Sequence, residues 1–304
     1  MGPTATGKTE LALRLADYIQ IEIINVDSVL IYKDMNIGAA KPTLDELNKV
    51  PHHLIDIISP LDSYSVAEFL NSTHQLINDI AKRGNTPVLV GGTMMYYNAL
   101  LNGISELPQS NPLIRDKLEQ RAKNDGVESL YTELSTIDIK ATQKISFNDK
   151  QRIIRALEVF YITGKPITQV QTQTNNYKLK NMNLLSLCIL PVERDILHQR
   201  INSRFDKMIN RGFIDEVLHL QKKYPTLTNA HTSMRSVGYY QVWQYLENII
   251  DKFQMLEMGK AATRQLAKRQ ITWLRKFEAI NIAKNGFNLD NMYLELTRLV
   301  DNLL

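Results

Sequence analysis

The sequence begins with a glycine-rich motif that strongly limits the fold around it. Residues 2–9 fit the pattern G-x-x-x-x-G-K-[ST], in which the backbone N–H groups of a loop surround phosphate oxygens. Lys8 is expected to reach the terminal phosphates, and the Thr9 hydroxyl is expected to ligate Mg²⁺. We therefore predict a di- or triphosphate site built from Gly2, Pro3, Thr4, Ala5, Thr6, Gly7, Lys8 and Thr9.

The apolar pattern after this motif predicts alternating helices and strands. A helix is expected over 9–19, strands over 21–26 and 86–90, and a further helix over 94–101. This alternation predicts an α/β fold: a P-loop NTPase-like core with a parallel sheet flanked by helices. Ligands of such sheets lie beyond the carboxyl ends of the strands. Asp27, Ser28 and Thr93 should therefore lie beside the phosphate loop.

The character of the chain changes after Pro108. Residues 112–183 are polar with helical spacing, which predicts an inserted all-helical subdomain. A core strand is expected over 184–190, followed by helices over 195–211, 214–223, 241–246 and about 259–277. Residues 1–111 and 184–304 would then form one catalytic core that the insertion interrupts.

Composition excludes several classes of protein. The 304 residues include one cysteine, Cys188, which lies in an apolar run and is expected to be buried, so no disulfide forms within the chain. No apolar run is long enough to cross a bilayer and no signal peptide precedes the loop, so we expect a cytoplasmic protein without a membrane partner. We also expect a monomer. The net charge of +4 permits a polyanionic partner.

Asp27 is the first candidate for chemistry. An acid at a strand tip beside a phosphate loop can coordinate Mg²⁺, act as a general base, or cap a turn. The other predicted strand tip, Val90-Gly91-Gly92, carries no acid, whereas a typical ATPase or GTPase places its Mg²⁺-holding Asp in such a position. Ordinary nucleotide hydrolysis is therefore disfavoured.

Basic residues form the second group of candidates. Arg200 and Arg204 lie four positions apart on one helix face and suit a diphosphate, and residues 260–276 hold six basic residues and no acid. Residues 151–155 offer a weaker basic face. A solvated surface is the alternative for each group. Trp273 is expected in the core, and His52 and His53 are expected in a loop without metal-ligand spacing.

Taken together, six motifs resemble the tRNA dimethylallyltransferase family, also called tRNA isopentenyltransferases. The resemblance keeps motif order from Gly2 to about Phe277. The phosphate loop alone occurs in many families, whereas its combination with Asp27-Ser28 and the C-terminal Arg-Gln-Ile-Thr-Trp run is specific. The motifs are residues 2–9, 27–32, 37–42, 91–93, 235–239 and 269–275.

The resemblance implies transfer of a dimethylallyl group from dimethylallyl diphosphate to N6 of adenosine 37, beside the tRNA anticodon. By this resemblance the loop holds the diphosphate, Asp27 is the general base, and Thr93 contacts the adenosine or its neighbourhood. Arg204 and Lys8 stabilise the leaving diphosphate, and Thr9 helps to place Mg²⁺. The tRNA anticodon stem-loop would meet Asp27, Ser28, Val29, Leu30, Thr93, Arg115, Gln151, Arg152, Ile153, Ile154, Arg155, Met234, Arg235, Ser236, Val237, Gly238, Tyr239, Lys268, Arg269, Gln270 and Arg275.

Two alternatives and one departure stay open at this stage. A nucleotide or small-molecule kinase would use the same loop with ATP, and a non-catalytic GTPase-like module would bind RNA without chemistry. The family carries an apolar strand before the phosphate loop, and this sequence begins at Met1-Gly2, so we expect the central strand of the sheet to be absent.

Overall fold

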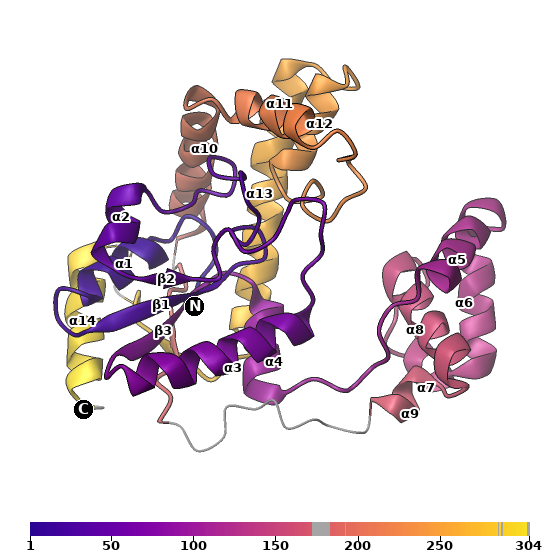
Figure 1. Ribbon diagram of the computed structural model, residues 1–304, viewed down its shortest axis with the longest axis horizontal. Helices are drawn as coiled ribbons and strands as arrows, with labels where there is room; N and C mark the ends of the chain where they lie inside the picture. Colours follow the sequence, from indigo (N-terminus) through magenta and orange to yellow (C-terminus); the bar gives the residue numbers. More distant parts are fainter. Residues whose placement is uncertain (172–182, 192, 285, 287, 303–304) are drawn as a thin grey trace. The chain divides into compact units, whose positions relative to one another are not determined.

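The computed structural model describes residues 1–171, 183–191, 193–284, 286 and 288–302, and it divides into two compact units (Figure 1). One unit comprises Met1–Asn98 and Leu179–Leu304, and the other comprises Ala99–Lys178. The first unit is therefore built from two separate stretches of the chain. The phosphate loop lies in this unit.

A three-stranded parallel sheet forms the base of the first unit. Strand β1 (Ile21–Val26) lies between β2 (His52–His53) and β3 (Thr86–Gly91). Ile24 of β1 is opposite Leu89 of β3, and every residue of β1 is buried. A strand that is rich in β-branched residues and buried on both faces is typical of a central parallel strand. The prediction of a strand over 21–26 is confirmed.

The two faces of β1 have different environments, because successive side chains of a strand point to opposite faces. Ile23 packs with Leu11 and Leu15 of helix α1 (Lys8–Leu15), in a cluster that also includes α14 (Leu289–Asp301). Glu22, on the other face, accepts hydrogen bonds from Arg83, at the end of α3 (Val66–Lys82), with distances of 2.8 and 2.7 Å. This pairing holds the pKa of Glu22 at about 2.

A second, two-stranded sheet pairs β4 (Leu187–Cys188) with β5 (Ile280–Asn281) in parallel. The first residue of the chain extends this ladder: the Met1 amino group donates to Leu187 O at 2.8 Å, and Ile189 N donates to Met1 O at 2.9 Å. The strand predicted over 184–190 is therefore much shorter than expected. Cys188 is buried, as predicted.

The first unit contains further helices and a second hydrophobic core. A second core cluster joins the segment around Ile31 and Met35 to Phe213, Val217 and Trp243. Within the described chain, no helix is long and apolar enough to cross a membrane. The helices are α2 (Leu44–Lys49), α10 (Arg194–Asn210), α11 (Phe213–Lys223), α12 (Tyr239–Leu246) and α13 (Lys252–Leu274), and α4 (Met94–Asn102) leads from the first unit into the second.

The regular secondary structure described in the second unit is helical apart from one bridge residue, Ser105, and the unit has its own core. Leu118, Leu130, Leu134, Ile154 and Leu157 are among its buried residues, and the whole cluster lies within the unit. Its helices are α5 (Pro112–Asn124), α6 (Gly126–Ile137), α7 (Ile139–Thr142), α8 (Lys150–Thr163) and α9 (Ile167–Val170).

The predicted fold class, an α/β P-loop-like core with a parallel sheet and flanking helices, is confirmed. Three local predictions are wrong. His52 and His53 form β2 and are not in a loop. Helix α13 begins at Lys252, seven residues before the predicted start, where Asp251 and Gln254 form a capping box. Trp273 is 37% exposed, and Lys276 Nζ lies 5.9 Å from its ring centroid.

Candidate active site

The phosphate loop leads directly into α1 and has the backbone that its glycines permit. Gly7 has φ of 84° and Ala5 has φ of 64°, so the chain turns sharply before Lys8 begins the helix. Lys8 Nζ donates to Pro3 O at 2.6 Å, and Thr6 Oγ1 donates to the same carbonyl at 2.8 Å. The loop and the amino end of the helix are therefore arranged as an anion-binding concavity.

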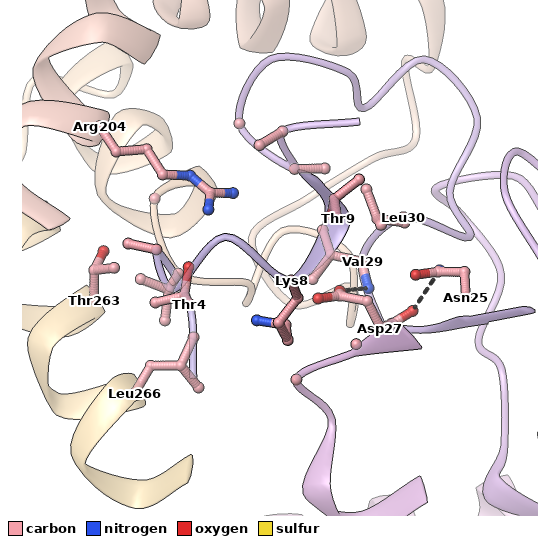
Figure 2. Close-up of a pocket in the computed structure, with 18 of the residues that line it drawn as sticks. Thr4, Lys8, Thr9, Asn25, Asp27, Val29, Leu30, Arg204, Thr263 and Leu266 are labelled. Carbon is pink, nitrogen blue, oxygen red and sulfur yellow. Dashed lines mark hydrogen bonds between the residues drawn. The ribbon is translucent and has the colours of Figure 1, made fainter. Parts of the chain in front are cut away.

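Asp27 follows β1 and faces the same pocket as Lys8 (Figure 2). Its Oδ1 accepts from Val29 N at 2.9 Å, which fixes the carboxylate at the strand tip. Burial raises the pKa of Asp27, while the Val29 N–H, Lys8 and Arg204 oppose this effect. A carboxylate with a raised pKa is a better proton acceptor than an exposed aspartate.

Arg204 reaches the pocket from α10 and completes a group of three charged side chains. Figure 2 shows its guanidinium pointing into the pocket that Lys8 and Asp27 also line. Burial, together with the Arg204 charge, lowers the pKa of Lys8 to about 7. Burial also lowers the pKa of Arg204, which Asp27 partly offsets. Two buried cations facing one carboxylate leave an excess positive charge, which suits a diphosphate.

A fixed wall closes another side of the pocket. Glu216 of α11 accepts from Asn36 N at 2.8 Å, Ile37 N at 2.6 Å and Gly38 N at 3.1 Å, and Tyr239 Oη donates to it at 2.7 Å. A Cβ at Gly38 would lie 2.0 Å from the Phe213 ring, so only glycine fits there. This loop, whose Gly38, Ala39 and Ala40 line the pocket, is therefore held rigidly against α11.

Two predicted contact residues serve as internal ties. Gln270 of α13 is 8% exposed; its Oε1 accepts from Thr4 N at 3.0 Å, and its Nε2 donates to Gly92 O at 2.8 Å. Thr93 Oγ1 accepts from Ser28 N at 3.0 Å. Gln270 lines the pocket, and Thr93 joins the segment after Asp27 to the residues that follow β3.

The structure brings many of the predicted site residues to this one pocket. The lining includes Thr4, Ala5, Lys8, Thr9, Asp27, Val29, Leu30, Arg204, Val237, Gly238 and Gln270. Lys268, Arg269 and Arg275 are exposed on or just after α13, and Arg235 is exposed before α12. The roles assigned to these residues stay predictions.

Other predicted tRNA contacts have buried side chains. Met234 and Tyr239 are 0% exposed in the first unit, and Ile153 and Ile154 are 0% exposed in the second. Arg155, in the second unit, donates to the buried Glu158 at 2.7 Å and to Pro108 O at 2.6 Å. These residues shape the surfaces beside them, and a direct tRNA contact by their side chains stays a prediction. Arg115, Gln151 and Arg152 lie on α5 and α8 in the same unit, and Gln151 and Arg152 are exposed.

Sequence reasoning missed part of the lining. Asn25 and His52 face the pocket from the sheet. His52 Nδ1 lies 2.7 Å from Val50 O, which makes it the protonated nitrogen, and its Nε2 is buried without a hydrogen-bond partner among the described residues. The alternation of Ile23, Asn25 and Asp27 along β1 is the signal that would have placed Asn25 on the ligand side.

The donor atoms at the pocket suit Mg²⁺. Thr9 and Asp27 supply hard oxygen ligands within one pocket. Among the described residues, no three His, Cys, Asp or Glu side chains gather to hold a metal ion. Mg²⁺ commonly uses one or two protein ligands together with substrate phosphates, so a pair of oxygen donors beside a phosphate loop fits this ion better than a closed metal cage.

A P-loop, a strand-tip carboxylate and a buried arginine above a parallel sheet define a phosphate-binding α/β transferase core. A family model described as IPP transferase matches residues 30–277. A tRNA dimethylallyltransferase from Legionella pneumophila (strain Paris) is 46% identical over 305 residues, covering 99% of this chain and 96% of the relative. One from Chromobacterium violaceum is 48% identical over 282 residues, covering 93% and 86%. This chain belongs to the tRNA dimethylallyltransferase family.

Solved structures agree with this assignment. The tRNA isopentenylpyrophosphate transferase of Bacillus halodurans has a TM-score of 0.69 and 34% identity, covering 99% of this chain and 94% of that chain. A eukaryotic dimethylallyltransferase acting on tRNA has a TM-score of 0.71 and 28% identity, covering 90% and 68%. The kinase alternative is not supported.

Proposed function

We propose that this protein transfers the dimethylallyl group of dimethylallyl diphosphate to N6 of adenosine 37 in the anticodon loop of tRNA. The observation that carries the proposal is the pocket in which Asp27, Lys8 and Arg204 meet, because the reaction needs a proton acceptor and a cationic diphosphate site side by side. Family membership supplies the identity of the two substrates.

The residues divide the chemistry between the two reactants. As the bond forms between N6 and the terminal allylic carbon, the bond from that carbon to the diphosphate oxygen breaks. Asp27 accepts the proton that N6 loses. Lys8 and Arg204 offset the charge that develops on the departing diphosphate. Mg²⁺, when bound, would add positive charge at the same phosphates, and the Thr9 hydroxyl is the group suited to hold it there, which leaves Asp27 as the proton acceptor.

Binding of tRNA rests on charge and on access to the base. Exposed Lys268, Arg269 and Arg275 give α13 and its end a cationic surface suited to phosphate contacts. The target base must leave its stack to reach a pocket of this kind. We assign further tRNA contacts to the helical unit containing α5–α9. We also propose that the protein acts in the cytoplasm, where its tRNA substrate would be found, and that it acts as a monomer.

The proposal is tested by incubating the protein with labelled dimethylallyl diphosphate, Mg²⁺ and unmodified tRNA. We expect label in tRNA, and nuclease digestion should place it on the adenosine next to the anticodon. A tRNA with guanosine at position 37 is the matched control and should accept no label. Absence of transfer to the adenosine-containing tRNA, with tight ATP binding instead, would contradict the proposal.

A further inference from the structure

The side chain of Gln270 joins two parts of the pocket that lie far apart in the sequence. Its amide oxygen accepts from Thr4 N at 3.0 Å, and its amide nitrogen donates to Gly92 O at 2.8 Å. Thr4 belongs to the phosphate loop, and Gly92 follows strand β3. Both functional ends of the amide are thus engaged by backbone groups of the active-site framework, and with 8% exposure the side chain offers little surface to RNA.

The Gln270 amide lies close to the backbone of Gly92. A Cβ added at Gly92 would lie 2.5 Å from Gln270 Nε2, whereas the next atom, Gly2 O, would be 3.4 Å away. Since Gly92 does not have a left-handed φ, Gln270 is the main obstacle to alanine at this position. A methyl group at position 92 would therefore displace the Gln270 amide from its two hydrogen bonds.

Hydrogen bonds also connect the residue after Gly92 to the two neighbours of Asp27, the proposed general base. The next residue, Thr93, has its N–H bonded to Val26 O at 3.1 Å, and its hydroxyl accepts from Ser28 N at 3.0 Å. Val26 and Ser28 flank Asp27 directly. A single path of hydrogen bonds thus runs from the phosphate loop through Gln270 and the β3 tip to both neighbours of Asp27.

We propose that Gln270 is a positioning residue that holds the phosphate loop at a fixed distance from the strand tip carrying Asp27, and that it does not contact tRNA. This inference rests on the proposed transfer reaction for its role. The reaction needs the allylic carbon, attached to a diphosphate in the loop, to meet an N6 amine beside Asp27. A displacement of about 1 Å between the phosphate loop and the strand tip that carries Asp27 costs on the order of 10²-fold in rate.

The first test compares Gln270→Ala with Gln265→Ala, an exposed glutamine on the same helix. For Gln270→Ala we expect the single-turnover transfer rate at saturating substrates to fall by about 10²-fold. The affinity for inorganic diphosphate should fall by about tenfold, while tRNA affinity stays within about twofold of wild type. Gln265→Ala should match wild type in all three measurements.

The second test is a double-mutant cycle with Gly92→Ala. The added methyl group displaces the Gln270 amide, so Gly92→Ala should lose transfer rate and diphosphate affinity to the same degree as Gln270→Ala. The double variant should be no worse than either single variant, because the displaced amide is already gone. Purely additive losses would mean that the two residues act independently, and would overturn the proposal.

Two other outcomes would assign Gln270 a different role. Weaker tRNA binding by Gln270→Ala, with unchanged diphosphate affinity and transfer rate at saturating tRNA, would make Gln270 an RNA contact and overturn the proposal. A uniform loss that parallels a lower melting temperature would reduce it to a stability residue. If the wild-type protein transfers nothing, the proposed function fails. The double-mutant cycle measured by diphosphate affinity would still test whether Gln270 positions the phosphate loop.

Discussion

Asp27 is the residue on which the proposed chemistry depends most directly. Replacing it with asparagine keeps the shape and the oxygen that accepts from Val29 N, but removes the proton acceptor. We expect Asp27→Asn to lower the transfer rate by about 10²- to 10⁴-fold, the usual contribution of a general base, and to leave tRNA affinity nearly intact. Single-turnover kinetics and filter binding measure the two quantities. Equal losses in both would assign Asp27 to tRNA binding.

The pKa of Asp27 sets the acid side of the pH profile. Because burial raises this pKa above its ordinary value, the carboxylate accepts a proton at a higher pH than an exposed aspartate would. The transfer rate should therefore fall as pH decreases through the raised pKa of Asp27. This limb should be absent from the residual rate of Asp27→Asn.

Lys8 sets the opposite limb. Its pKa is lowered to about 7 by burial and by Arg204, so the amino group loses its proton above neutral pH in the free protein. Diphosphate favours the protonated form, so its affinity should fall by up to about tenfold per pH unit above 7. Calorimetry with inorganic diphosphate at pH 6 and pH 8.5 measures this dependence.

Lys8→Arg is the matched control, because arginine stays protonated over this range. The ratio of wild-type to variant affinity should decline from pH 6 to pH 8.5, and this ratio cancels the titration of diphosphate itself. A constant ratio would mean that Lys8 keeps its proton throughout, contrary to the lowered pKa.

The sequence predicted the charged centre of the site but not its framework. Lys8 and Asp27 could be placed together because a phosphate loop and a strand tip share one edge of a parallel sheet. Glu216 and Gln270 could not be placed, because their partners are distant in the sequence and leave no local pattern. Glu216 accepts from backbone N–H groups 178 to 180 residues away, and Gln270 accepts from one that is 266 residues away. His52 was missed for a related reason: a strand of two residues has no detectable alternation.

At the scale of elements, helix α13 combines an internal and an external function. Gln270 faces inward, Arg264 donates to Asn202 of α10 at 2.7 Å, and Lys268 and Arg269 are exposed. The sequence indicated a basic helix, but spacing alone did not separate these faces, because all three cations lie within six residues. The tertiary contacts of Arg264 and Gln270 make this separation.

This separation gives a prediction for α13. Lys268→Ala and Arg269→Ala should each weaken tRNA binding and reduce the slope of log affinity against log salt by about 0.7 to 1, as expected for one lost phosphate contact. Lys252→Ala, which removes an exposed cation at the other end of α13, is the control and should keep the wild-type slope. Filter binding across a salt series measures this. An unchanged slope in both variants would remove this face from the tRNA interface.

At the scale of the whole molecule, the two compact units have separate hydrophobic cores. The clusters around the sheet and around Phe213 belong to one unit, and the cluster around Leu130 and Leu157 belongs to the other. Polar composition and helical spacing indicated a helical insertion near 112–183, whereas the compact unit spans Ala99–Lys178. The difference at its start arises because α4 runs through the boundary without a turn or a change in composition.

Because the two units have separate cores, a core substitution in one unit should destabilise that unit and leave the other folded. Leu157 is 0% exposed in the helical unit, and Leu157→Ala should destabilise that unit by about 2–5 kcal/mol. Hydrogen exchange should quicken in α5, α6 and α8, while amides of β1 and β3 keep their protection. If the helical unit binds tRNA, transfer should decrease through weaker tRNA affinity, and inorganic diphosphate should bind as in wild type.

Leu113→Ala, at a position that is 75% exposed on α5, is the matched control and should change none of these quantities. Loss of diphosphate binding in parallel with the faster exchange would show that the two units unfold together, since the proposed diphosphate site lies in the other unit.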